Sequence, residues 1–168
     1  MIPADVDIAT LTAELADDGV FVGEEAIQRD QLITGLQDVV AHADAAGVGP
    51  MRIAVIDQMP EHTSDLRDIA DALLASTDAN LVVVRNPESG AIVSGEYSRA
   101  AIEAAQYYVL NDPDYVRSGN FLIDQLAASD TAWGLVFGAI VLAIVVVIGV
   151  AWVGFSRLRS GHTTHQSR

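Results

Sequence analysis

The chain has 168 residues, with 9 basic side chains, all of them arginine, 23 acidic side chains and no cysteine. Residues 1–130 carry six Arg and all of the acids, a net charge of −17, whereas residues 131–168 carry three Arg and no acid. This acidity excludes nucleic acid as a partner, because binding to phosphates needs clustered cations, and the missing cysteines exclude disulfides and a cysteine nucleophile.

The first third of the chain is predicted to contain two helices and two strands. A short helix and a short strand straddle the acidic turn at residues 17–19. Between Glu24 and Ala46 apolar residues recur at helical spacing, and Glu24 and Glu25 favour the positive start of that helix. Residues 51–56 read MRIAVI, a short apolar run that predicts a buried strand.

A βαβ unit is predicted next. Thr63 or Ser64 can cap the helix that follows the MRIAVI strand, and residues 80–85, NLVVVR, form a second buried strand. Strand, helix and strand should therefore be parallel and right-handed. Residues 91–94 are short enough for an antiparallel edge strand.

Two further helices complete the predicted domain. The first runs from about residue 98 to residue 110, and Asp112 then caps the second, with Pro113 in its first helical position. The expected fold is α/β: a small sheet, made of the parallel βαβ unit plus the antiparallel edge strand, lies between helices.

The strongest single signal is an apolar run near the end of the chain. From Trp133 to Phe155 there are 23 residues without a charge, enough for a helix of roughly 35 Å that crosses a bilayer. Trp133 and Trp152 are placed for the two membrane interfaces, where Arg157 and Arg159 can also reach the headgroups. We therefore predict a soluble domain at 1–130, a membrane-spanning helix at 131–156 and a short basic tail at 157–168.

The charges on either side of this run predict its orientation. The tail carries three Arg and no acid, which favours a cytoplasmic C-terminus and an extracytoplasmic domain. The start of the chain has neither the basic nor the apolar region of a cleavable signal peptide. The opposite topology, with the domain in the cytosol, stays open.

Gly134 and Gly138 form a GxxxG pattern within the predicted span. Such glycines let two helices approach closely, so a homodimer through this face is one prediction. Glycine is common in membrane helices, however, and the pattern is equally compatible with a monomer.

Polar residues at the ends of the two parallel strands suggest a ligand site. Ligands of open α/β sheets bind beyond the carboxyl ends of such strands, where this chain has Asp57, Arg85 and Asn86. The alternative is structural: Asp57 belongs to an ordinary turn and forms an ion pair with Arg85.

No cofactor is assigned, although a divalent cation such as calcium is possible at this edge. Its candidate ligands are Asp57, Glu61, His62 and Asp65. The competing interpretation makes Asp65 a charge at the start of a helix. No nucleophile elbow, P-loop or dinucleotide-binding motif occurs, so no catalytic residue is assigned.

The order of these elements resembles a known family. From MRIAVIDQMP through a helix to NLVVVRNPESGAIVSGEYS, and on to a Tyr-bearing helix and the Asp-Pro helix, the chain is similar to the TPM domain. Over roughly residues 1–160 it looks like single-pass actinobacterial membrane proteins with such a domain and a C-terminal anchor. The resemblance implies a domain that faces the cell wall, and a regulator of cell separation that binds and activates an NlpC/P60 peptidoglycan endopeptidase.

Two hypotheses follow. The first is this non-enzymatic, membrane-anchored interaction domain, with the hydrolase and membrane lipid as partners. The second is a divalent-cation-dependent phosphatase, because some TPM domains are similar to weak acid phosphatases with bound calcium. Their site residues have no residue-by-residue match in this chain.

Overall fold

The computed structural model describes residues 1–129 together with Ile144 and Ile148. Residues 1–129 form one compact unit. Within the described part of the chain, no helix has the length and hydropathy needed to cross a bilayer. The predicted span falls almost wholly outside the described residues, as do its two tryptophans, its GxxxG glycines and the arginines that follow it.

The compact unit has one mixed sheet in the order β1-β2-β3-β4. The parallel pairs are β1 with β2 and β2 with β3, and β4 is antiparallel to β3. The elements with printed bounds are α1 (Ile8–Asp18), β1 (Val20–Val22), α2 (Arg29–Ala45), β2 (Met51–Val55), α3 (Thr63–Ser76), β3 (Leu81–Arg85), β4 (Gly90–Ser94) and α4 (Arg99–Asn111). Residues 115–129 are also helical. The predicted α/β fold, a mixed sheet between helices, is confirmed.

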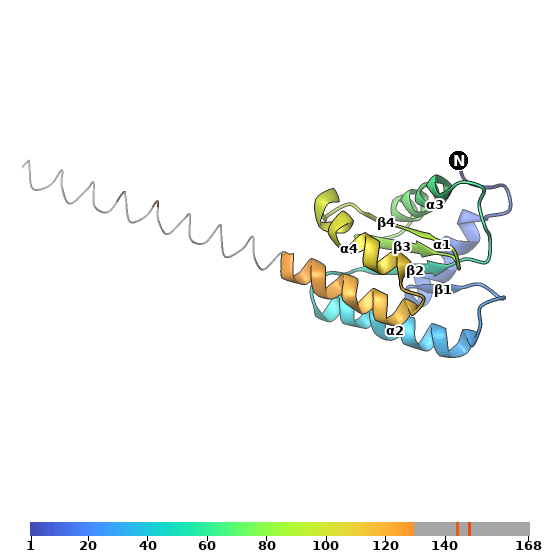
Figure 1. The fold of residues 1–168 in the computed structure, drawn as a ribbon, viewed down its shortest axis with the longest axis horizontal. Coiled ribbons are helices and arrows are strands. Elements are labelled where there is room, and N and C mark those ends of the chain that lie inside the picture. The colour runs from blue at the N-terminus through green and yellow to red at the C-terminus, as the bar shows by residue number, and fades with distance from the viewer. Residues whose placement is uncertain (130–143, 145–147, 149–168) are drawn as a thin grey trace, which may run out of the picture. The chain divides into compact units, whose positions relative to one another are not determined.

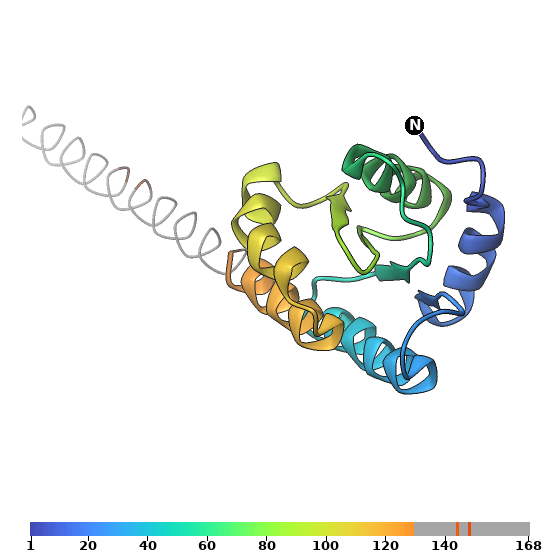
Figure 2. The ribbon, with the colours of Figure 1, turned by 45° about the vertical axis from the view of Figure 1, so that its right-hand side comes forward.

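Helices cover both faces of the sheet (Figures 1 and 2). Because side chains alternate along a strand, Ile53 packs into one core and Ala54 into the other. The core on the side of Ile53 is closed by α2, α4 and the 115–129 helix, and the opposite core by α1 and α3. The domain is thus a three-layer sandwich.

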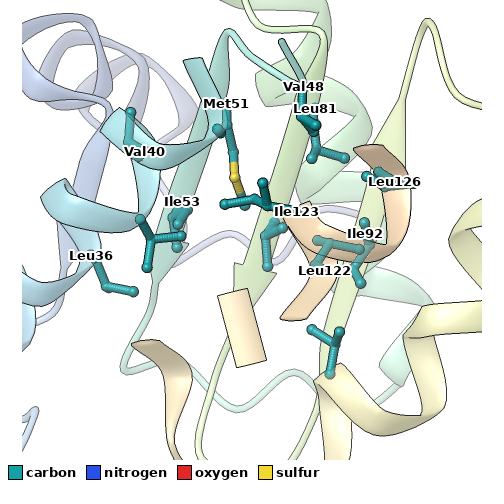
Figure 3. Close-up of a cluster of buried hydrophobic side chains, with 14 of the residues drawn as sticks. Leu36, Val40, Val48, Met51, Ile53, Leu81, Ile92, Leu122, Ile123 and Leu126 are labelled. Atoms are coloured by element: carbon teal, nitrogen blue, oxygen red, sulfur yellow. The ribbon is translucent and has the colours of Figure 1, made fainter. Parts of the chain in front are cut away.

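The larger core joins segments that are far apart in the sequence (Figure 3). Leu36 from α2, Met51 from β2 and Leu81 from β3 are fully buried there. The 115–129 helix contributes Leu122, which is also fully buried. This helix therefore belongs to the domain core and is held in place by apolar packing.

The start of α2 differs from the prediction. The helix begins at Arg29, and Glu24 and Glu25 lie in the preceding turn instead of its first turn. Gln28, immediately before the helix, has φ 55°, a left-handed conformation that is uncommon for a residue other than glycine. The apolar spacing placed the body of the helix correctly, but it carries no information about this backbone reversal.

Two predicted helix caps are wrong. The residue before α3 is His62, whose side chain makes no capping bond, so neither Thr63 nor Ser64 serves as the cap. Asp112 follows the end of α4, and its carboxylate is used in an ion pair. Asp114 starts the last helix instead, since its Oδ1 accepts the backbone N–H of Arg117 at 3.0 Å.

Shortening Leu122 tests the contribution of the last helix to the core. The variant Leu122→Ala should lose about 2–5 kcal/mol of unfolding free energy, because it leaves a cavity at a fully buried position. Urea denaturation of the full chain in detergent, followed by circular dichroism, measures the loss. The exposed neighbour Gln125 supplies the control: Gln125→Ala should stay within about 0.5 kcal/mol. Equal effects of the two variants would contradict this packing.

Candidate functional site

A groove opens at the carboxyl ends of the parallel strands, where ligands of α/β sheets bind. Its volume is about 590 Å³. The turns after β1 and β2 supply Ile27, Asp57 and Met59 to its lining, the turn after β3 supplies Pro87, and the start of the last helix supplies Tyr115. We call this surface the carboxyl-edge groove. Of the predicted strand-end residues, only Asp57 lines it.

Asp57 is held against the turn that follows β1. Its Oδ1 accepts the backbone N–H of Glu25 at 3.3 Å. A Cβ at Gly23 would lie 2.2 Å from the same oxygen, so only glycine permits this approach. Gly23 is itself tied to β2, because its N–H donates to the Val55 carbonyl at 2.8 Å. The carboxylate thus bridges the first two strand ends.

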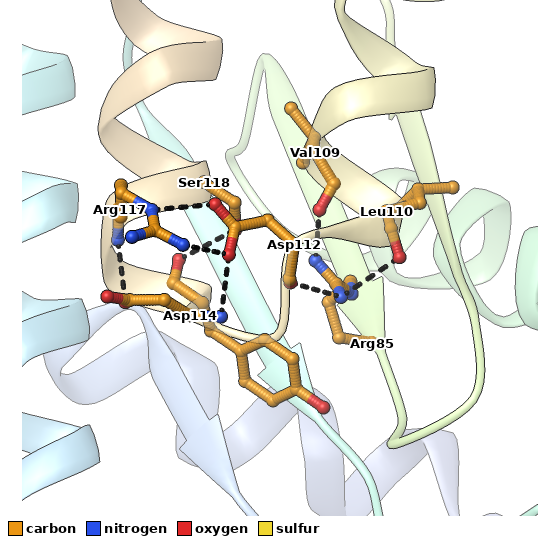
Figure 4. Close-up of polar contacts among 8 residues, drawn as sticks. Arg85, Val109, Leu110, Asp112, Asp114, Arg117 and Ser118 are labelled. Atoms are coloured by element: carbon orange, nitrogen blue, oxygen red, sulfur yellow. Dashed lines mark hydrogen bonds and ion pairs between the residues drawn. The ribbon is translucent and has the colours of Figure 1, made fainter.

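Arg85, the last residue of β3, is buried and points at the end of α4 (Figure 4). Its Nη1 donates to the Val109 carbonyl at 2.5 Å, and its Nη2 donates to the carbonyls of Leu110 at 3.3 Å and Asp112 at 3.2 Å. These carbonyls include acceptors that a helix end leaves without intrahelical partners. Burial lowers the pKa of Arg85 below its usual value. Arg85 therefore supports the backbone, and the suggested ion pair with Asp57 is wrong.

Tyr115 lies over this arginine and forms a wall of the groove. Its ring centroid is 4.5 Å from the Arg85 Cζ, a cation–π contact. Its hydroxyl donates to the Asn86 carbonyl at 3.1 Å. Asn86 is also buried, and its side chain donates to the Gln58 carbonyl and accepts the N–H groups of its own turn. Arg85 and Asn86 thus shape the groove from beneath.

An ion pair fixes the chain between α4 and the last helix. Arg117 Nη2 donates to Asp112 Oδ1 at 2.6 Å, and Arg117 Nε donates to Oδ2 at 2.8 Å. The Asp112 carboxylate also accepts the N–H of Asp114 at 2.9 Å. The Arg117 contact and then this backbone bond lower the pKa of Asp112 to about 2. The buried carboxylate holds the segment that carries Pro113 and Tyr115 into the groove.

The lining of the groove combines apolar and acidic groups. Among the described residues, the side chains that line it include Glu25, Asp57 and Asp114 and no basic one. Ile27 is 89% exposed and Met59 is 54% exposed. Large apolar side chains in such open positions, grouped around a concave surface, are typical of binding sites. The groove is suited to a partner that offers apolar and positively charged groups.

The predicted cation ligands are not gathered into one site. Asp65 instead accepts a hydrogen bond from the Met1 amino group at 2.7 Å, and His62 lies at the start of α3. Among the described residues, no group of three or more His, Asp or Glu is arranged to hold a metal ion. Asp57 lines the carboxyl-edge groove, whereas Glu61, His62 and Asp65 do not.

Five residues that shape the groove were missed as site residues: Glu25, Ile27, Met59, Asp114 and Tyr115. Two of them had a local signal. Ile27 stands in a polar stretch and Met59 stands in a turn, positions where a large apolar side chain has no predicted core to enter. Glu25, Asp114 and Tyr115 had no comparable signal.

This architecture defines the class of the protein: a small α/β sandwich with an open groove at the carboxyl edge of its sheet. The solution structure of the N-terminal domain of cg2496 from Corynebacterium glutamicum has a similar fold, with a TM-score of 0.51 and 15% sequence identity. The similarity covers 77% of this chain and 86% of that one.

The sequence comparison identifies the family. Residues 1–166 match the model of the membrane protein Rv1476 family, and the chain belongs to that family. Membrane protein Rv1476 of Mycobacterium tuberculosis (strain ATCC 25618 / H37Rv) is 30% identical over 149 residues, which cover 89% of this chain and 73% of that protein.

Acid should destabilise the domain through Asp112. Because its pKa is lower in the folded state, the carboxylate contributes stability above its unfolded pKa, and this contribution is lost as the pH falls from about 4 to about 2. Urea midpoints of the full chain in detergent across this range measure the effect. Asp112→Asn should be less stable than the parent at pH 7 and should lose less stability with acid. An unchanged pH dependence in this variant would contradict the role of the ion pair.

Proposed function

We propose that this chain is a membrane-anchored, extracytoplasmic interaction protein that binds and activates a peptidoglycan hydrolase of the NlpC/P60 type in cell separation. The resemblance to TPM-domain proteins suggests the partner. The observation that carries the proposal is the carboxyl-edge groove, with its exposed Ile27 and Met59 beside acidic side chains.

The chemistry of the groove favours a protein partner. Apolar side chains such as Ile27 and Met59 gain free energy when a partner removes them from water. The neighbouring carboxylates then select for arginine or lysine on that partner and disfavour acidic surfaces. The net charge of −17 over residues 1–130 should also speed the approach of a basic partner. A phosphate monoester, by contrast, would meet three carboxylates and no basic side chain in the lining.

Anchoring would add to the affinity by restricting where the domain can act. In the sequence only three residues separate Ser129 from Trp133, the first residue of the predicted span. A domain attached so closely can reach only partners near the membrane, where tethering raises its effective concentration. Activation would follow if the domain binds an open form of the hydrolase more tightly than an inhibited form.

Binding to an NlpC/P60 hydrolase should depend on the two exposed apolar residues. The double variant Ile27→Asp, Met59→Asp should bind at least about tenfold more weakly, because it removes apolar contact and adds negative charge beside carboxylates that a basic partner would cover. Calorimetry with the full chain in detergent measures the affinity. Ala13→Asp, at an exposed residue of α1 that lines neither this groove nor the cavities beside β4, is the control for added charge and should bind normally.

Two outcomes would contradict this proposal. One is an unchanged affinity in the double variant, or no binding of the parent at micromolar concentration. The other is hydrolysis of p-nitrophenyl phosphate by the full chain that Asp57→Asn abolishes, which would favour the phosphatase hypothesis.

The proposed topology requires the two ends of the chain to lie on opposite sides of the membrane. The arginines at 157, 159 and 168 favour a cytoplasmic tail. An alkaline phosphatase reporter, which is active only outside the cytoplasm, should therefore give activity when fused before residue 1 and none when fused after residue 168. A fluorescent reporter that folds only in the cytoplasm is the reciprocal control. The reverse pattern would overturn both the topology and the cell-wall role.

A further inference from the structure

The outer edge of β4 is a second surface that the proposed function does not use. Within the described residues, β4 is the last strand of the sheet and pairs only with β3. None of the residues that line the carboxyl-edge groove lines the cavities along this edge. The backbone N–H and C=O groups of β4 that do not bond to β3 point toward this outer edge and are free to bind another strand.

Two bonds just outside the ladder settle this question. Beyond one end, the Gly95 N–H donates to the Asn80 carbonyl at 3.2 Å; beyond the other, the Asn86 N–H donates to the Ser89 carbonyl at 3.0 Å. Hydrogen-bonded pairs alternate with non-bonded pairs along an antiparallel ladder. The same residue pairs are therefore hydrogen-bonded whether the alternation is followed inward from the Gly95 bond or from the Asn86 bond.

The residues of β4 therefore fall into two sets. Ala91 and Val93 are bonded to β3, opposite Val84 and Val82. The N–H and C=O groups of Gly90, Ile92 and Ser94 point away from β3, toward the outer edge. Ile92 is only 3% exposed, and outside the strand ladder no backbone hydrogen bond to its N–H or C=O is found within the described residues. Backbone groups that are buried and unpaired are costly and rare.

These groups lie along a groove between two helices. Three adjoining cavities of about 480, 340 and 110 Å³ follow the edge, and all three share Arg67 of α3 and Gln106 of α4 in their lining. Ile92 of β4 lines the two smaller ones. We call this surface the β4-edge groove. Since α3 and α4 both border it, it has room for one added strand more readily than for a second sheet with helices of its own.

The charges along the part of the β4-edge groove that Ile92 lines are paired. Arg99 Nε lies 2.7 Å from Glu103 Oε1, and Arg67 Nε lies 3.8 Å from Asp71 Oδ2. The other residues of the two smaller cavities are neutral, with Thr63 and Ser64 on the side of α3 and Leu110 on the side of α4; Glu88 adds a further charge only to the largest cavity. An occupant without net charge complements the stretch beside Ile92, in contrast to the acidic carboxyl-edge groove.

We propose that the β4-edge groove binds an extended, uncharged segment of a partner polypeptide, which joins the sheet as a fifth strand. Main-chain bonds to Gly90, Ile92 and Ser94 supply the recognition, as in other cases of strand addition. Ala91 and Val93 keep their bonds to β3. The partner thus satisfies backbone groups that the described part of the chain leaves unpaired.

Amide hydrogen exchange of the full chain in detergent micelles, read by NMR, tests the free edge first. The Ile92 amide should exchange at least about tenfold faster than those of Ala91 and Val93, because it lacks their ladder bonds. This comparison needs no variant. Equal protection of the three amides would overturn the proposal, since the edge would then be closed.

A capped heptapeptide of alternating threonine and valine is the probe for the added strand. At millimolar concentration it should slow exchange at Ile92 about tenfold or more and shift the amides of Gly90 and Ser94. The same peptide N-methylated at every residue cannot donate along either edge and should have no effect. Ile92→Pro removes the outward N–H and should abolish the response, whereas Ile92→Ala shortens the same side chain but keeps the N–H and should retain it.

Three results would overturn the proposal. The first is an Ile92 amide that exchanges freely whether or not the peptide is present, which would mean that only water occupies the edge. The second is protection of Ile92 that grows with protein concentration alone, which would make a second copy the occupant. The third is a peptide response confined to residues of the carboxyl-edge groove.

Discussion

The hydrogen bonds of the buried Arg85 guanidinium are the interactions on which the shape of the carboxyl-edge groove depends. It links the end of β3 to the carbonyls at the end of α4 and lies under the ring of Tyr115. A buried cation without such partners would be strongly destabilising. The ion pair between Asp112 and Arg117 then holds the following turn. Two separate polar contacts thus position the wall of the carboxyl-edge groove.

This arrangement assigns the charged residues of the edge to different tasks. Arg85 and Asp112 are buried: Arg85 donates to backbone carbonyls, and Asp112 accepts from Arg117 and from the Asp114 N–H. Asp57, Glu25 and Asp114 line the groove. With its basic neighbour withdrawn, the groove is left acidic beside exposed apolar side chains. This combination of carboxylates and exposed apolar side chains is the observation on which the proposed function rests.

The fold was predictable because apolar spacing reports burial directly. The runs at 51–56 and 80–85 are almost continuously apolar, as strands covered on both faces must be, and both are strands in the structure. The site was harder to predict. Arg85 was expected either to bind a ligand or to pair with Asp57, whereas its actual partners are carbonyls whose position depends on where α4 ends in space. Gln28 adopts its left-handed conformation without any residue type that requires it. Tyr115 falls within the last predicted helix, and nothing in the sequence shows that it forms a wall of the groove.

The central claim is that the carboxyl-edge groove contacts a peptidoglycan hydrolase in the cell. Photocrosslinking from a reactive amino acid placed at position 27 tests it most directly, with position 13 on α1 as the comparison, since both positions are exposed and position 13 lines neither groove. The account predicts that position 27 yields a covalent adduct with an NlpC/P60 hydrolase and that position 13 does not. A hydrolase adduct from position 13 alone, or adducts from position 27 that never contain such a hydrolase, would contradict it.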